Sequence, residues 1–549
     1  MNAAVLEVRE PSAKYLALAE LEATREFELL ATAQAGISRL RQLILNLAVR
    51  GMLMPQIPTE EHAATVLSFA RAARAEDTAV RRARQTTRQL DDDADRERRQ
   101  LPAGWLLVSG ADLYRVVRGV SYEKQQASDV ASAGAVPLLR ANNIQRTLNF
   151  DDAVFVPSGL VAAEQLLRAG DYVVCMASGS KDLVGKAASF VEGPTCTFGA
   201  FCAAIRPYAG TLAPYLGVFL SSPLYRDEVS AESAGIGINN LKSSTLLSLR
   251  LPLPPLAEQQ RIVARVEELM KLCDALEQSG RLADEQHARL TSTLFDALAA
   301  SESADALAEN WRRVAEHFDL LLDRPQAIDA FEQVILQLAV RGLLVVGQSE
   351  PSCWKETTAG AVLSFLNGYA FKSEWFRSKG VRLVRNVNVA HGALNWTNGA
   401  CVDDAVAQDM ERFALQTGDL VISLDRPLIS TGLKYAVVRE CDLPCLLLQR
   451  VARMAPRAEV LDAAYLELWL QSPAFLGSID PGRSNGVPHI STRQLEAIPF
   501  LLPPLPEQHR IVARVEELRR LCAQLRERLT EARRTQSQLA DALVAEAVA

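Results

Sequence analysis

The chain has 549 residues, too many for one compact domain, and its 49% hydrophobic and 23% charged residues are typical of a soluble folded protein. No apolar run reaches the ~20 residues that cross a bilayer, and the first residues lack the pattern of a secretory signal, so the cytoplasm is the expected location. The net charge of −7 argues against a strongly basic nucleic-acid-binding protein.

The charge is unevenly distributed along the chain. Segments 101–254 and 351–502 are neutral, with 12 Lys/Arg against 12 Asp/Glu and 15 against 15, so the remainder holds 32 Lys/Arg against 39 Asp/Glu. Nine scattered cysteines argue against a disulfide framework. Cys441 and Cys445 lack a second pair or a nearby histidine, so buried thiols are expected there, and no metal site is predicted.

The first hundred residues (1–100) are predicted to be helical. The apolar pattern indicates a helix over 21–53, with Gly51 after Arg50 as its stop signal. A charged, Ala/Arg-rich helical insertion follows at about 59–99.

Residues 101–254 have the pattern of an α+β domain. Runs at 135–139 and 172–176 favour strands, and the Gly170-Asp171 pair favours a turn before the second of them. An amphipathic helix is predicted at 213–220.

Residues 255–350 are predicted to be a helical spacer. Pro254-Pro255, followed by a glutamate in the first turn, is a helix-start signal, and the helix is expected to run to about 299 with Gly280 as a potential break. Such a helix of about 40 residues is roughly 60 Å long. A second helical pattern at 311–344 ends at Arg341-Gly342.

Residues 351–502 repeat the α+β pattern, with predicted strands at 420–423 and 435–438 and a helix at 463–470. A C-terminal helix at 503–549 is expected to continue to about 547. Both long helices carry apolar residues at alternating steps of four and three, the spacing of a coiled-coil seam. The seam residues are Ile262, Val266, Leu269, Cys273 and Leu276 in the first and Ile511, Val515, Leu518, Cys522 and Leu525 in the second.

Two internal repeats relate the halves of the chain. PPLAEQQRIVARVEEL at 254–269 returns as PPLPEQHRIVARVEEL at 503–518, and LNLAVRGML at 45–53 returns as LQLAVRGLL at 336–344. Weaker matches at offsets of 245–250 join the segments between them, such as Trp105 with Trp354. The pattern predicts a pseudo-twofold α+β protein in which two divergent domains alternate with long, antiparallel, coiled-coil-like helices.

Polar loop residues in the two variable domains are candidates for contacts with DNA, because Arg can pair with guanine and Asn or Gln with adenine, while Lys contacts phosphate. The alternative for each is a solvated loop or a turn-capping asparagine. In the first domain the candidates are Arg140, Asn142, Asn143, Gln145, Arg146, Ser178, Ser180, Lys181, Lys186, Asn239, Asn240 and Lys242. In the second they are Arg385, Asn386, Asn388, Arg426, Lys434, Arg483, Asn485, His489 and Arg493.

No catalytic motif is complete. The chain lacks an Asn/Asp-Pro-Pro-aromatic loop, and the stretch GSKDLVGKA at 179–187 departs from a phosphate-binding loop in spacing and last residue. The acidic run 91–93 fits a solvated face, and the six histidines have no supporting motif. Independent catalysis and a cofactor bound to this chain are therefore not expected.

The duplicated LPPLAEQQRIVARVEEL and LPPLPEQHRIVARVEEL helices resemble those of type I restriction–modification specificity subunits, over nearly the whole chain. RGMLMPQ at 50–56 and LPAGW at 101–105 are similar to one branch of that family, whereas PSCWKETTAG at 351–360 departs from the Leu-Pro-x-Gly-Trp entry and blurs the second domain's start.

The resemblance implies a non-catalytic subunit. Each recognition domain would bind one half of a split DNA site, and the helices would set an unread spacer and dock two methyltransferase subunits. S-adenosylmethionine, and ATP with magnesium, would be bound by partner subunits, which include two restriction (motor–nuclease) subunits. Three alternatives stay open: a stand-alone DNA-binding or anti-restriction protein, a fused enzyme with a divergent cofactor site, and a structural coiled-coil adaptor.

Overall fold

The structure is a computed structural model that describes residues 32–33, 35–77, 101–232, 239–345, 354–430, 432–479, 482–484 and 487–548. It divides into two compact units, the first formed by residues 1–282 and 533–549 and the second by 283–532. Each unit therefore joins one α+β domain to parts of both long helices. The predictions for 1–31 and 78–100 lie outside the described residues.

The first domain contains two main sheets and a closing ribbon. The larger sheet has the order β2 (Tyr114–Arg118), β9 (Cys202–Pro207), β5 (Asp171–Cys175), β7 (Ala187–Phe190). The smaller has the order β4 (Val154–Pro157), β3 (Ala135–Leu139), β8 (Thr197–Phe198). Strand β1 (Leu106–Ser109) pairs antiparallel with β11 (Arg250–Leu253), so the two ends of the domain meet.

The second domain repeats this arrangement. Its larger sheet has the order β13 (Leu363–Asn367), β22 (Val451–Pro456), β17 (Leu420–Ser423), β20 (Tyr435–Val437), β15 (His391–Gly392). Its smaller sheet has the order β16 (Cys401–Val402), β14 (Val381–Val384), β21 (Cys445–Leu447), and β12 (Lys355–Thr358) pairs with β25 (Pro499–Leu502). The prediction that the two variable segments share a fold is confirmed.

Short elements complete each domain. In the first they are α7 (Gly110–Leu113), α8 (Ala213–Ser221), α9 (Pro223–Glu232), α10 (Ser243–Ser248), β6 (Ala177–Ser178) and β10 (Asn239–Asn240). In the second they are α15 (Ala359–Val362), α16 (Asp404–Asp409), α17 (Ala463–Gln471), α18 (Pro473–Ser478), α19 (Thr492–Glu496), β18 (Leu428–Ile429), β19 (Gly432–Leu433), β23 (Gly482–Ser484) and β24 (Val487–His489). The predicted strands and short helices match their counterparts to within one residue at each end.

The two long helices are α11 (Leu256–Ala299) and α20 (Leu505–Val548), each of 44 residues. They run antiparallel, because the first part of α11 and the last part of α20 both belong to the first unit. Helix α11 continues through Gly280, so the predicted potential break is absent there. A single glycine weakens a helix without interrupting it when its backbone bonds are kept.

The shorter scaffold helices differ from the prediction. In the first unit α3 (Gly36–Val49) ends at the expected glycine, and α4 (Ala63–Glu76) forms the described part of the insertion. In the second unit the predicted helix at 311–344 is three helices, α12 (Ala304–Glu316), α13 (Phe318–Leu321) and α14 (Pro325–Val340). Pro325 explains the last break, because a proline favours the first turn of a helix and disfavours its interior.

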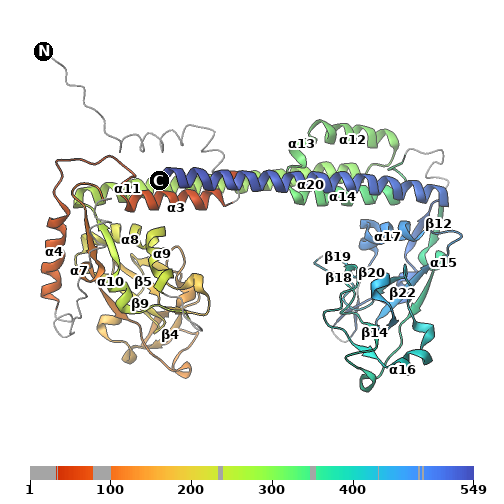
Figure 1. The fold of residues 1–549 in the computed structure, drawn as a ribbon, viewed down its shortest axis with the longest axis horizontal. Helices are drawn as coiled ribbons and strands as arrows, with labels where there is room; N and C mark the ends of the chain where they lie inside the picture. The colour runs from red at the N-terminus through yellow and green to blue at the C-terminus, as the bar shows by residue number, and fades with distance from the viewer. Residues whose placement is uncertain are drawn as a thin grey trace, which may run out of the picture. The chain divides into compact units, whose positions relative to one another are not determined.

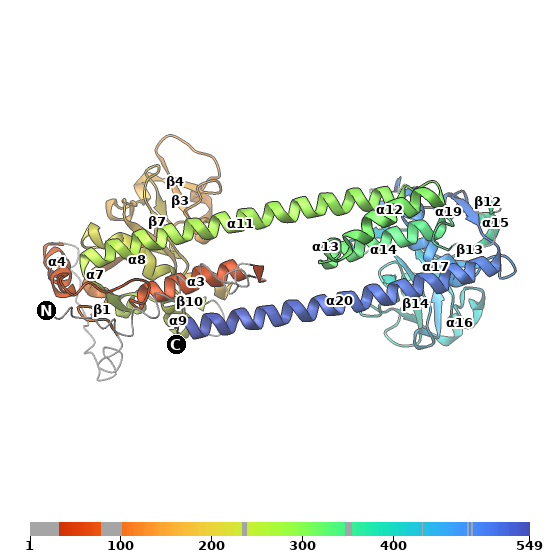
Figure 2. The same ribbon diagram turned by 90° about the horizontal axis from the view of Figure 1, so that it is seen from above.

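The scaffold helices associate in the same way in each unit. In the first, α3 lies between α11 and the end of α20 (Figure 2): Arg41 pairs with Asp274 at 2.7 Å and Arg39 with Asp541 at 2.7 Å. In the second, α14 lies between α20 and the end of α11, and Arg526 pairs there with Asp329. The long helices are therefore joined through a short helix in each unit.

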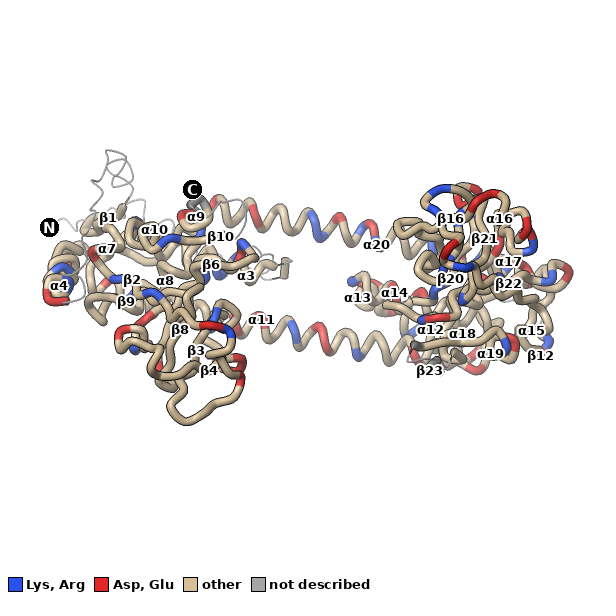
Figure 3. The backbone as a smooth tube through the Cα atoms, turned by 90° about the horizontal axis from the view of Figure 1, so that it is seen from below, with Lys and Arg blue, Asp and Glu red and all other residues tan. Residues whose placement is uncertain are grey.

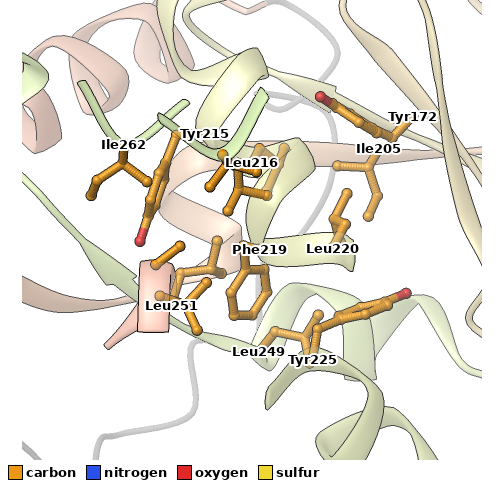
Figure 4. Close-up of a cluster of buried hydrophobic side chains, with 14 of the residues drawn as sticks. Tyr172, Ile205, Tyr215, Leu216, Phe219, Leu220, Tyr225, Leu249, Leu251 and Ile262 are labelled. Atoms are coloured by element: carbon orange, nitrogen blue, oxygen red, sulfur yellow. The ribbon is translucent and has the colours of Figure 1, made fainter. Parts of the chain in front are cut away.

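The seam positions of the long helices are mostly buried. Ile262, Val266, Leu269 and Cys273 are 0–6% exposed and belong to one apolar cluster with α3 and the first domain, and Ile511, Val515 and Cys522 are equally buried in the second unit. Leu276, Leu518 and Leu525 are half-buried. In the first unit α8 and α9 separate the helices from β5 and β9 (Figure 1), and Figure 4 shows Ile262 facing Tyr215 of α8.

The repeated Pro-Pro-Leu-x-Glu-Gln motif has a structural role. The Nε2 of Gln259 donates to the Pro254 carbonyl at 2.8 Å, and Gln508 makes the same bond to Pro503. Glu258 accepts hydrogen bonds from Trp105 and Gln56 at 2.8 and 2.7 Å, and burial raises the pKa of its carboxyl. The motif thus ties each long helix to the adjoining domain.

Candidate nucleic-acid interface

The two domains share a backbone framework at the edge where β6 and β10 pair. In the first domain Asn239 and Asn240 pair with Ser178 and Ala177, and in the second an isolated antiparallel bridge joins His489 to Asp425. Three backbone hydrogen bonds of the first domain have counterparts in the second. In the first domain they join Leu241 N to Met176 O (2.7 Å), Met176 N to Phe201 O (2.8 Å) and Cys175 N to Lys186 O (2.9 Å). In the second domain they join, in the same order, Ile490 N to Leu424 O (2.9 Å), Leu424 N to Arg450 O (2.8 Å) and Ser423 N to Lys434 O (3.0 Å).

This framework defines four equivalent positions, here called the variable edge. They are Ala177, Ser178, Phe201 and Asn240 in the first domain and Asp425, Arg426, Arg450 and His489 in the second. The backbone hydrogen bonds correspond at these positions while the side chain changes in size, charge and polarity. The backbone conformation differs at two of them, because Arg426 and Arg450 have positive φ angles and Ser178 and Phe201 do not. The variable edge also brings together candidates that lie far apart in the sequence, namely Ser178 with Asn240 in the first domain and Arg426 with His489 in the second.

A buried carboxylate organises the variable edge of the second domain. The Asp425 side chain is 8% exposed; its Oδ2 accepts from Nη1 of Arg450 at 2.7 Å and its Oδ1 from Nδ1 of His489 at 2.8 Å. The Arg450 side chain is 48% exposed and that of His489 30%. Because the carboxylate only accepts hydrogen bonds, Nδ1 of His489 carries the proton in this pair.

The first domain has a different chemistry at the same positions. Phe201 is 67% exposed, a large apolar side chain in contact with solvent. Ala177 occupies the position of Asp425 and has no side-chain hydrogen-bonding group, while Asn240 is exposed. This edge offers an apolar surface beside an amide, whereas the other offers a guanidinium and an imidazole.

Lys434 is buried at 9% exposure and donates from Nζ to the backbone carbonyl of Asn386, and burial lowers the pKa of its ammonium. The Lys434 ammonium, predicted to contact DNA, is used inside the domain in this structure. The equivalent Lys186 is half-buried, and Lys181 is exposed.

Asn143 and Asn388 are also structural residues rather than DNA contacts. They are 1% and 0% exposed, and each side-chain oxygen accepts from the backbone N–H of the arginine three residues earlier. Each Nδ2 donates at 2.9 Å to the carbonyl of Asn149 or Asn395. The turn-capping alternative fits this pair, because both side chains are buried and bonded to the backbone of their own loops.

Three of the candidate arginines contact the protein itself. Arg140 donates to the carbonyl of Asp152, and Arg385 donates to that of Asn398. Arg146 forms an ion pair at 2.8 Å with Asp274 of α11, which also holds Arg41. Arg146 thus fastens the first domain to the scaffold, although its side chain is 62% exposed.

For the other candidates, the side-chain positions are as follows. Asn142, Gln145 and Lys242 are exposed in the first domain, and Arg426 and Arg493 in the second; Asn386 is half-buried. Arg483 lies in β23 and Asn239 in β10, with side chains outside the described set, and Asn485 lies outside the described residues.

The sequence predictions missed Asp425, Arg450 and Phe201. Their signal is the alignment of the two halves at offsets of 248 and 249, which places Lys186 beside Lys434 and Phe201 beside Arg450. The match between Phe201 and Arg450 is recognised only once the strand pairing is known, because these residues lie 15–16 positions after the matching lysines in the sequence.

Charge does not mark either domain as a DNA-binding surface by itself. In each unit Figure 3 shows Lys and Arg interleaved with Asp and Glu on the side in view. The described residues contain no group of three or more His, Cys, Asp or Glu placed to hold a metal ion. Among the described helices, none combines the length and apolar character needed to cross a membrane.

Some exposed leucines of the two long helices occupy matching positions in the two units, whereas Leu282 of α11, at 53% exposure, corresponds to a glutamate at residue 531. In the first unit the matching leucines are Leu272 of α11 and Leu539 of α20, at 50% and 48% exposure. In the second unit they are Leu521 of α20 and Leu290 of α11, at 54% and 47%. The repeat offset of 249 relates Leu272 to Leu521 and Leu290 to Leu539.

Comparisons with known proteins identify the family. Residues 105–284 match the type I restriction modification DNA specificity domain. The EcoAI specificity subunit of Escherichia coli is 35% identical over 93% of this chain and 94% of its own length. The chain belongs to the specificity subunits of type I restriction enzymes.

Two further similar proteins have lower identities to this specificity subunit. The EcoKI specificity subunit of Escherichia coli K12 is 29% identical and covers 76% of this chain and 83% of its own. A solved chain from a study of type I R-M complex assembly aligns with 81% of this chain and 98% of its own, at 18% identity and a TM-score of 0.47.

Proposed function

We propose that this specificity subunit recognises a bipartite DNA site, with each α+β domain binding one half. The observation that carries the proposal is the variable edge, where one backbone framework presents different base-recognising side chains in the two domains. Arginine, asparagine and histidine pair with base edges in the major groove, and phenylalanine can contact the thymine methyl group. Two such edges suit a site composed of two unlike halves.

Partner subunits supply much of the contact with phosphate in this proposal. Both domains are neutral, and the remainder of the chain is acidic. Because neutralised phosphates provide most sequence-independent affinity, the chain alone is expected to bind DNA weakly. The chain itself carries out no catalysis, and the target adenine in each half-site is methylated by the partners.

The scaffold docks two copies of one methyltransferase subunit. Support comes from the exposed leucines, which recur at equivalent positions in both units (Leu272 with Leu539, and Leu521 with Leu290). Matching positions in the two units would suit two copies of the same partner. Each copy brings its own S-adenosylmethionine, and two motor–nuclease subunits with ATP and magnesium complete the restricting form.

A domain exchange tests whether each domain recognises its own half of the DNA site. Residues 105–250 are replaced by the same segment of another family member, and the methylated sequence is determined in cells that express the partner subunits. One half of the recognised sequence is expected to change and the other to stay the same, because each domain keeps its own framework. A change in both halves would contradict the proposal. Exchange of 354–500 should alter the opposite half.

A further inference from the structure

Two arginines at the variable edge have an unusual backbone. Arg426 and Arg450 have φ angles of +46° and +71°, and only Ala35 joins them among the described non-glycine residues with positive φ. A side chain in this left-handed region costs free energy that glycine or asparagine would reduce. Arginine at both positions therefore indicates that the side chains themselves are needed.

The guanidinium of Arg450 is oriented before any ligand arrives. Its Nη1 donates to Asp425, whose carboxylate is buried and is also held by His489. A guanidinium has five N–H donors, so donors on Nε and Nη2 stay available for a ligand. A half-exposed arginine fixed by a buried carboxylate suits the paired acceptors O6 and N7 of guanine.

The equivalent positions in the first domain change together. Where the second domain has Arg450 supported by Asp425, the first has Phe201 above Ala177, which could not hold a guanidinium. Arg450 and Asp425 are thus both replaced in the first domain, whereas the lysine at Lys434 is kept as Lys186. A paired change of a solvent-exposed side chain and the group that holds it is expected of positions that set specificity.

We propose that Arg450, positioned by Asp425, recognises a guanine in the half-site of the second domain, and that Phe201 recognises a thymine methyl in the half-site of the first. The proposal rests on the proposed function, since it assigns bases to the two halves of the same site. His489 is held against Asp425 and contributes a second, adjacent contact.

The test uses the full chain assembled with its methyltransferase subunits. The complex is incubated with a DNA library in which each position of the wild-type site is randomised in turn, and the methylated molecules are sequenced. The variants are Arg450→Ala, Arg450→Lys, Asp425→Asn and Phe201→Ala. Arg377→Ala is the matched control, because Arg377 also pairs with an aspartate, Asp403, in the same domain but away from the variable edge.

Arg450→Ala is expected to lose preference for guanine at one position of one half-site, with about a 10- to 100-fold fall in discrimination. The guanine preference of Arg450→Lys and Asp425→Asn should fall between those of Arg450→Ala and the wild type. Phe201→Ala should weaken the preference for thymine at one position of the opposite half-site. Arg377→Ala should keep the wild-type pattern. The unchanged half-site in each variant shows that the protein has folded.

Two results would overturn the inference: an Arg450→Ala complex that keeps the wild-type preference at every position, or one that loses activity equally on all sequences, as expected for a phosphate contact. A wild-type complex that shows no sequence preference would instead contradict the proposed function itself, so the two failures are distinguishable.

Discussion

Each long helix has one buried glutamine near its start, whose side chain donates a hydrogen bond to the carbonyl of a proline just before the helix. Gln508 is fully buried; its Nε2 donates to the carbonyls of Pro503 and Val460, and its Oε1 accepts from the backbone N–H of Asp462. Gln259 makes the equivalent bond to Pro254. The part of the sequence that is most alike in the two halves thus owes its likeness to packing at the root of each helix.

Replacement of Gln508 by alanine should destabilise the second unit. The change leaves two carbonyls and one N–H without partners in a buried place, at a cost of about 2–3 kcal/mol. Gln524, exposed on the same helix, is the control, and Gln524→Ala should change stability by less than about 0.5 kcal/mol. Urea denaturation of the full chain measures both. Equal midpoints for the two variants would show that the buried amide contributes little.

Sequence patterns located the elements of this fold well, and individual contact residues poorly. The ends of α11, α20, β3 and β17 follow from apolar spacing, from prolines and from glycines, which act locally. The role of Asn143 could not be found in this way, because a capping asparagine and a base-contacting asparagine have the same local sequence. Lys434 is buried only because the strands bring the Asn386 loop against it.

Glycine has opposite effects in two scaffold elements. Gly51 ends α3 with φ +69°, and a Cβ there would lie 2.3 Å from Cγ of Pro102, whereas Gly280 lies within α11 with no atom in reach of a Cβ. Gly280→Ala should therefore stabilise α11 by about 0.5–1 kcal/mol. Gly51→Ala should destabilise the first unit, because it adds both backbone strain and a clash.

Thermal unfolding of the two glycine variants checks this contrast. A raised midpoint for Gly280→Ala and a lowered one for Gly51→Ala are expected. A lowered midpoint for Gly280→Ala would mean that the centre of α11 needs the freedom of glycine, and its description as an uninterrupted helix would have to change.

At the scale of the whole molecule, one structural plan is used twice. Each unit joins a domain to a short helix, to the start of one long helix and to the end of the other, so neither half of the sequence forms a unit without the other. The repeated segments carry the contacts that both units need, and the variable domains carry the differences. Such a division lets the variable domains change while the scaffold contacts are repeated within the chain.

Lengthening the scaffold tests its proposed role as a spacer. Residues 277–286 of α11 and 530–535 of α20 are exposed, so seven residues inserted into each stretch would disturb little packing. The insertion adds about 10 Å of helix, equivalent to about three base pairs. We expect both half-sites to be kept and the unread gap to grow. The turn at 300–303 is a poorer place for this insertion, because α11 ends at Ala299.

The most direct test of the central claim is the adenine methylome of the host with and without this chain. Deletion of the chain should abolish methylation at one bipartite motif, two short unlike sequences around a gap of fixed length, and the intact chain should restore it. Methylation of an undivided motif, or a motif that survives deletion while the partner methyltransferase is present, would contradict the assignment of sequence recognition to this chain.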